Sequence, residues 1–187
     1  MYYVRTAIIL IMIKRLREKK IFDTKLFTIK DIDLRLENGS EVTYQIMEKA
    51  DTALIVPINN NGDLILVKEY YSAIDEYQYG LPKGKIESGL DDLETANKEL
   101  QEEIGYKAGK LDKLTVLTMS PGYFTQKTHV FLARDLVTSK LDGDEPEELE
   151  VTEYPFRDFE KLILDGKLTE ARMIAALYLA KRFIENL

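Results

Sequence analysis

The chain has 187 residues, enough for one compact domain with a substantial core, and 45% of them are apolar and 32% are charged. Its net charge of −7 argues against a general nucleic-acid-binding protein, whose surface should be basic, and the absence of cysteine excludes disulfides and thiolate metal sites. A protein without cysteine suits the cytoplasm, which is the location that we predict.

A continuous apolar run covers residues 7–13, and a basic stretch follows it. The run is too short to span a membrane, because about 20 apolar residues are needed to cross a bilayer. No small-residue cleavage site follows, so a signal peptide is not expected either. Two interpretations stay open: a β-strand, or an upstream extension whose working start lies nearer Met12.

Residues 26–36 alternate apolar and polar side chains, which is typical of a half-buried strand. Asn38 and Gly39 then predict a hairpin turn, and residues 42–47 read as the returning strand. This antiparallel unit is too small to be stable alone, so it must pack on the main domain or on a partner chain.

The rest of the chain predicts a mixture of strands and helices. Strands are expected at residues 53–58, 63–71, 77–81, 111–119, 128–133 and 151–156. Helices are expected at residues 157–165 and 169–187. The buried side of the second helix should carry Ala171, Ile174, Ala175, Tyr178, Leu179 and Phe183. With a further helix between the strands, the pattern gives an α/β fold, an α/β/α sandwich with a mixed sheet.

That further helix lies in residues 84–106, the most informative stretch of the chain. Asp91 is a favourable N-cap in a capping-box arrangement with Glu94, and Gly105 is a natural C-terminal stop. One helix face is expected to pack into the core, and it carries Leu93, Ala96, Leu100 and Ile104.

The opposite face carries a cluster of carboxylates. Glu99, Glu102 and Glu103 stand at offsets of zero, three and four, which places them together on one face of an α-helix. Clustered carboxylates repel one another unless a cation joins them. Hard oxygen ligands suit Mg²⁺ or Mn²⁺, and these ions in turn suit phosphate chemistry.

The same stretch resembles the Nudix box, G-x5-E-x7-R-E-U-x-E-E-x-G-U, where U is a bulky apolar residue. The matching positions are Gly84, Glu99, Leu100, Glu102, Glu103 and Gly105. Leu90 stands where the box has glutamate, Lys98 stands where it has arginine, and the final position holds the semi-apolar Tyr106. The resemblance implies a hydrolase with the Nudix fold, which is also an α/β/α sandwich.

The resemblance also implies a metal site made of the Gly84 carbonyl, Glu99, Glu102 and Glu103, with Glu102 and Glu103 as catalytic residues. Mg²⁺ is the expected cofactor, with Mn²⁺ as a substitute, and the bound ions would acidify a water and stabilise the leaving phosphate. Glycine is expected at position 84 because the backbone there must approach the ion closely.

The two departures from the box should have unequal effects. Lys98 keeps the charge of arginine without its planar fork, so we expect weaker support of the site and not an inactive site. Leu90 removes a carboxylate that supports metal binding in relatives, which predicts a lower metal count or a changed substrate preference.

Beyond the box, the chain resembles the ADP-ribose pyrophosphatase branch of the family. Members carry a proline after the box, often in a Ser-Pro-Gly turn, and Pro121 matches it. They also carry an N-terminal antiparallel region, often exchanged in a dimer, which matches residues 26–48. We therefore assign residues 1–48 to an extension and a β unit for dimerisation, and residues 49–187 to a Nudix hydrolase domain.

Further segments, among them LFTIKDIDLRLENG and EARMIAALYLAKRF, resemble Nudix enzymes that act on ADP compounds. The resemblance implies a homodimer that cleaves ADP-ribose, NADH and short diadenosine polyphosphates with release of AMP. We expect no nucleic-acid partner and no membrane partner. Two alternatives stay open: hydrolysis of other nucleoside diphosphate sugars, or a catalytically silent domain that senses ADP-ribose or NAD.

In this branch the base that deprotonates the water often comes from an acidic loop after the box. The frame Glu-x-apolar-x-Val makes Glu147 the first candidate, with Glu145 and Glu148 behind it. The alternative interpretation of this loop is a solvated acidic turn.

A nucleotide base needs an apolar slot with a few polar groups. Candidate substrate-binding residues are Lys68, Tyr70, Lys83, Pro121 and Tyr123, with the two lysines facing the diphosphate. Other aromatic candidates, each of which also suits the core, are Tyr71, Tyr77, Tyr79 and Phe124. His129, the one histidine of the chain, is expected to pack on a strand.

Overall fold

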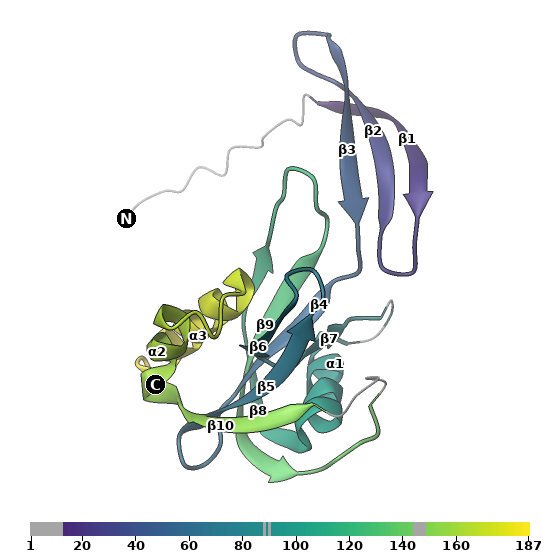
Figure 1. Ribbon diagram of the computed structural model, residues 1–187. Coiled ribbons are helices and arrows are strands. Elements are labelled where there is room, and N and C mark those ends of the chain that lie inside the picture. Colours follow the sequence, from purple (N-terminus) through teal and green to yellow (C-terminus); the bar gives the residue numbers. More distant parts are fainter. Residues whose placement is uncertain (1–12, 88, 90, 144–148) are drawn as a thin grey trace, which may run out of the picture. The chain divides into compact units, whose positions relative to one another are not determined.

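The computed structural model describes residues 13–87, 89, 91–143 and 149–187. The chain divides into two compact units, which Figure 1 shows as ribbons. The first contains the chain up to Lys49 together with Ser120–Thr125, and the second contains Ala50–Met119 and Gln126–Leu187. Within the described ranges, no helix is long and apolar enough to cross a membrane.

The first unit is a three-stranded antiparallel sheet of β1 (Lys14–Asp23), β2 (Thr28–Arg35) and β3 (Glu41–Glu48). β2 and β3 are the two strands predicted from the alternating pattern, and Gly39 turns between them with a φ of 82°. Segment 120–125 is hydrogen-bonded to β3, since the Met47 N–H donates to the Tyr123 carbonyl at 2.6 Å. β1 was not predicted, because its charged and almost wholly exposed sequence carries no alternating signal.

The second unit contains two sheets. The first has the order β7 (Lys83–Lys85), β4 (Thr52–Pro57), β9 (Lys127–Thr138) and β8 (Tyr106–Thr118), with β4 parallel to β9 and the other pairs antiparallel. The second is antiparallel, with the order β10 (Glu150–Pro155), β5 (Asp63–Tyr71) and β6 (Glu76–Gly80). All strands predicted between residues 53 and 156 are present, whereas residues 7–12 of the apolar run, for which a strand was one interpretation, lie outside the described residues. β8 and β9 extend beyond the predicted ranges, because backbone pairing continues through their polar ends from Tyr106 opposite Thr138.

Helices cover both sides of these sheets (Figure 1). α1 (Asp92–Glu99) and η1 (Leu100–Ile104) pack on one core cluster, and η2 (Phe156–Asp158), α2 (Phe159–Leu164) and α3 (Ala171–Ile184) pack on the other. Neighbouring strand residues enter opposite clusters, as Phe131 and Leu132 do. The α/β/α sandwich is therefore confirmed.

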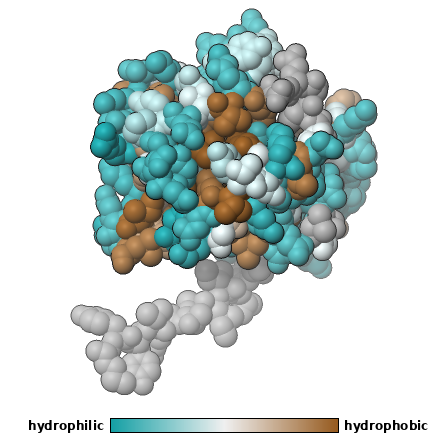
Figure 2. All heavy atoms as spheres, turned by 90° about the horizontal axis from the view of Figure 1, so that it is seen from below, coloured by the Kyte–Doolittle hydropathy of each residue, from teal (hydrophilic) through white to brown (hydrophobic). Residues whose placement is uncertain are grey.

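The buried face of α3 differs from the prediction. Its fully buried residues are Met173, Ala176, Leu177 and Ala180, whereas Ala171 and Tyr178 are exposed. Apolar residues occupy most of the helix circumference, so periodicity alone did not fix which stripe faces the core. On the face of the molecule that Figure 2 shows, hydrophobic residues lie among hydrophilic ones.

Candidate active site

Both ends of the carboxylate helix are formed by the residues that the sequence predicted. Asp91 Oδ1 accepts the backbone N–H groups of Leu93 at 2.7 Å and Glu94 at 3.4 Å. Gly105 ends the helix in the left-handed region, with φ 75° and ψ 24°. The assignment of Leu93 to the core was wrong, since it is 41% exposed. The first buried residues of α1 are Thr95 and Ala96, so the first turn lies beyond the packed surface.

The helix is α-helical only as far as Glu99. From Leu100 to Ile104 it continues as a π-helix, in which the Gly105 N–H donates to the Leu100 carbonyl five residues back. The expectation of one continuous α-helix was therefore wrong over this last turn. Single π turns inside helices are frequent at functional sites, because the wider turn changes the directions of the side chains.

Gly84 of β7 lies against the side chain of Glu99. A Cβ atom on Gly84 would stand 1.8 Å from Glu99 Cδ and 1.9 Å from Oε1, far inside any van der Waals contact. Position 84 therefore accepts only glycine while Glu99 keeps this conformation. β7 is held in place by β4, with Gly84 opposite Ala53.

Glu103 faces the same strand as Glu99. Only 5% of Glu103 is exposed, and its Oε2 accepts the backbone N–H of Lys83 at 3.1 Å. A buried carboxylate is costly unless it is hydrogen-bonded or paired, so this bond helps to keep the side chain in place. Of the four predicted metal ligands, the structure thus brings Glu99 and Glu103 to the strand that carries Gly84.

Glu102 is held by a lysine of its own helix. Lys98 Nζ lies 2.9 Å from Glu102 Oε2, and the Glu102 side chain is 12% exposed. The start of the acidic loop is close by, because a Cβ on Gly143 would lie 3.6 Å from the Glu102 Cβ. In the part of the chain that the structure describes, no three acidic or histidine side chains already surround a common ion position. The Glu102 carboxylate must therefore move toward Glu99 and Glu103 if all three are to share an ion.

The donor set nevertheless suits a hard divalent cation. It consists of carboxylate oxygens and the carbonyl of Gly84, and oxygen-only sets are those that Mg²⁺ and Mn²⁺ prefer. The missing Cβ at Gly84 leaves the Glu99 carboxylate directly against the backbone of β7.

The predicted substrate-binding residues are not all brought together. Lys68 and Tyr70 share one face of β5, where Tyr77 lies 5.8 Å from Lys68 Nζ and 5.2 Å from the Tyr70 ring, measured to ring centres. Lys68 pairs with Glu150 at 3.0 Å, and this hydrogen bond raises the pKa of Lys68.

Lys83 occupies a different place from Lys68. It pairs with Glu69, which precedes Tyr70 on β5 and therefore points to the other face of that strand. Pro121 and Tyr123 belong to the first unit. Leu90 and the three base candidates, Glu145, Glu147 and Glu148, lie outside the described residues.

His129 lies on β9, as expected, but it takes part in a polar cluster that sequence reasoning missed. Its Nδ1 is 2.6 Å from Asp92 Oδ2, and Lys113 pairs with the same carboxylate. These residues are far apart in the sequence and match no spacing rule, so no local signal identified them.

Several known proteins are similar to this chain over most of its length. A family model described as NUDIX domain matches residues 48–177. The ADP compounds hydrolase NudE of Escherichia coli (strain K12) is 36% identical over 165 residues, which cover 87% of this chain and 88% of that protein. The ADP-ribose pyrophosphatase of Bacillus subtilis (strain 168) is 33% identical over 171 residues, covering 88% and 92%. The crystal structure of an ADP compounds hydrolase superposes with a TM-score of 0.85 at 35% identity, covering 93% of this chain and 95% of that one.

Proposed function

The chain belongs to the Nudix family of hydrolases, and from that premise we propose that it cleaves the diphosphate linkage of ADP-linked compounds and releases AMP. The observation that carries the proposal is the approach of Glu99 and Glu103 to the segment around Gly84, where the first glycine of the box meets its carboxylates. The names of the similar hydrolases support ADP-linked substrates, with ADP-ribose, NADH and diadenosine polyphosphates as candidates.

We propose that the Gly84 carbonyl, Glu99, Glu102 and Glu103 hold Mg²⁺, for which Mn²⁺ substitutes. A divalent ion supplies charge neutralisation at the diphosphate oxygens and a more acidic water. The helix and β7 hold Glu99 and Glu103 in place, and Lys98 offsets part of the repulsion among the carboxylates by pairing with Glu102. Glu147 stays our proposed base.

Among the substrate candidates, Lys83 is the residue best placed for the diphosphate. It directly precedes Gly84, and its own backbone N–H is bonded to Glu103. We propose that Lys83 Nζ leaves Glu69 to neutralise a phosphate oxygen. Lys68, Tyr70, Pro121 and Tyr123 stay predictions, as does the cytoplasmic location.

The test of the activity is AMP release in the presence of Mg²⁺ from ADP-ribose, NADH, diadenosine triphosphate and a nucleotide sugar without adenine. We expect hydrolysis of the adenosine compounds. Faster hydrolysis of the nucleotide sugar would favour the alternative substrate class. Binding of ADP-ribose without turnover would contradict the proposed activity and favour a silent sensor.

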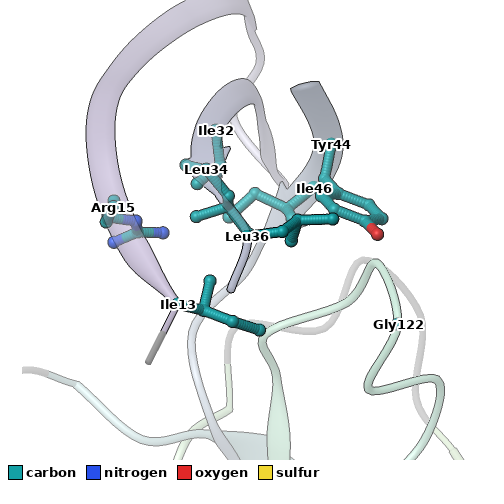
Figure 3. Close-up of a pocket in the computed structure, with 8 residues that line it drawn as sticks. All are labelled: Ile13, Arg15, Ile32, Leu34, Leu36, Tyr44, Ile46 and Gly122. Atoms are coloured by element: carbon teal, nitrogen blue, oxygen red, sulfur yellow. The ribbon is translucent and has the colours of Figure 1, made fainter. Parts of the chain in front are cut away.

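We further propose that the chain forms a homodimer through its first unit. A groove of about 370 Å³ lies on this unit, and Figure 3 shows the mostly apolar side chains that line it. The lining residues are Ile13, Arg15, Ile32, Leu34, Leu36, Tyr44, Ile46 and Gly122. Polar side chains, such as Asp33 bonded to Thr43, lie on the opposite face of the sheet. An exposed apolar face with a polar opposite face marks an interaction site, and a second copy of the chain would cover it.

Two neighbouring substitutions on β3 test the dimer. Ile46→Lys places a charge in the apolar groove and should halve the molar mass measured by light scattering. Gln45→Lys places the same charge on the polar face, where Gln45 already bonds to Asp31, and should leave the mass unchanged. Equal masses for both variants would contradict the groove as the interface.

A further inference from the structure

Three charged side chains surround His129 in the second unit. His129 Nδ1 is 2.6 Å from Asp92 Oδ2, and its Nε2 is 3.5 Å from Asp51 Oδ2. Lys113 of β8 pairs with Asp92 and lies 3.3 Å from Nδ1. The histidine side chain is only 18% exposed. The cluster therefore joins α1, β8, β9 and the start of β4.

The distances indicate which ring nitrogen of His129 donates a proton to Asp92. At 2.6 Å, Nδ1 and a carboxylate oxygen must share a proton, because two lone pairs would repel each other at that separation. Nδ1 therefore donates to Asp92, and the Lys113 ammonium, which has only protons to donate, also donates to Asp92. Asp51, at the longer distance, is the weaker partner.

Asp92 is the first residue of α1, immediately after the cap residue. Its partial burial acts to raise the pKa of the carboxyl, but the hydrogen bonds from Lys113 and His129 outweigh this effect and lower the pKa. Asp92 is therefore ionised at neutral pH, and a negative charge in the first turn is also favoured by the helix dipole.

Asp51 fastens the other side of the ring to the sheet. Its side chain accepts the Lys127 N–H at 2.8 Å, and its carbonyl accepts the Ile86 N–H at 2.9 Å, two residues after Gly84. Through His129, the start of α1 is thus connected to the same edge of the sheet that presents Gly84.

We propose that His129 is a positioning residue for the carboxylate helix: its bond to Asp92 fixes the first turn of α1 on β9 and so fixes where Glu99 meets Gly84. This inference rests on the proposed function. Asp92 and Glu99 are about 10 Å apart along the helix axis, a distance over which an α-helix is rigid, so a displaced first turn also displaces the carboxylate.

Replacing His129 with asparagine or with glutamine tests the contacts of its two ring nitrogens separately. The amide nitrogen of asparagine occupies about the place of Nδ1, so His129→Asn keeps a donor for Asp92. The amide nitrogen of glutamine reaches about the place of Nε2, so His129→Gln keeps only the side toward Asp51. The control is Lys110→Gln, which breaks an exposed ion pair with Asp135 on the same two strands.

Two measurements detect a displaced helix without substrate. Mn²⁺ binding is followed from the electron paramagnetic resonance signal of free Mn²⁺, and hydrogen exchange reports the opening of the α1 amides. We expect His129→Gln to weaken Mn²⁺ binding about tenfold, as loss of an outer-shell partner does, and to speed exchange in α1. His129→Asn and Lys110→Gln should stay within about twofold of the unchanged chain.

Other outcomes overturn the inference. If the unchanged chain, His129→Asn and His129→Gln all bind Mn²⁺ alike, His129 has no positioning role, whatever the activity. If asparagine and glutamine weaken binding equally, the ring acts only by packing. Mn²⁺ binding without AMP release by the unchanged chain would contradict the proposed function alone, since the comparison among variants needs no substrate.

Discussion

Replacing Gly84 with alanine is expected to lower kcat/KM for AMP release by more than about 100-fold, because loss of an outer-shell metal partner alone costs 10–100-fold. The added Cβ would stand 1.8 Å from Glu99 Cδ, so the carboxylate must turn away or β7 must move. The Glu99 side chain is long and half-buried, so it can turn away more easily than β7 can move. The variant should therefore fold and lose its metal-dependent activity.

Gly143→Ala is the matched control, since Gly143 lies beside the same helix. Its added Cβ would meet the Glu102 Cβ at 3.6 Å, an ordinary contact, so activity should stay within about twofold. The measurement is kcat/KM at increasing Mg²⁺ concentration, with circular dichroism to confirm the fold. Normal activity of Gly84→Ala would show that hydrolysis does not need Glu99 against β7.

Elements with local signals were predictable from the sequence. Asp91 and Gly105 end the helix through their own side chain and backbone, and the strand alternation at residues 28–35 reflects a sheet with one apolar face. The sequence also identified the three carboxylates of one short helix, and two of them, Glu99 and Glu103, lie against β7.

Elements that depend on distant partners were not predictable. β1 is a strand because β2 offers it backbone hydrogen bonds, and its charged side chains carry no sign of this. The π-helical turn after Glu99 is likewise invisible in the spacing of the glutamates.

Contacts in the candidate site that join distant residues were likewise not predictable from residue spacing. The contact between Gly84 and Glu99 was expected only from the resemblance to the Nudix box, because residue spacing gives no distance between a strand and a helix. The cluster around His129 joins positions 51, 92, 113 and 129, which only the folded sheet brings together. A lone histidine in a sequence carries no mark of such partners.

Replacing Glu102 with glutamine is expected to lower AMP release by more than about 100-fold, again beyond the effect of an outer-shell change. The change removes one of the three charges proposed to bind the metal and keeps the shape of the side chain. Stability should change by less than about 1 kcal/mol, because Lys98, the ion-pair partner, is 60% exposed and pairs of that kind contribute little. Removal of a like charge beside Glu99 and Glu103 also relieves repulsion.

Lys98→Gln distinguishes the effect of the Glu102 carboxylate from the effect of its ion pair, since this variant breaks the pair and leaves Glu102 charged. This variant leaves both oxygens of the Glu102 carboxylate to the ion, so it should keep most of its activity at saturating Mg²⁺. The measurement is AMP release by both variants across Mg²⁺ concentrations, beside thermal unfolding. An equal loss in both would mean that the contact between Lys98 and Glu102 carries the effect, whereas a loss in Glu102→Gln alone assigns it to the carboxylate.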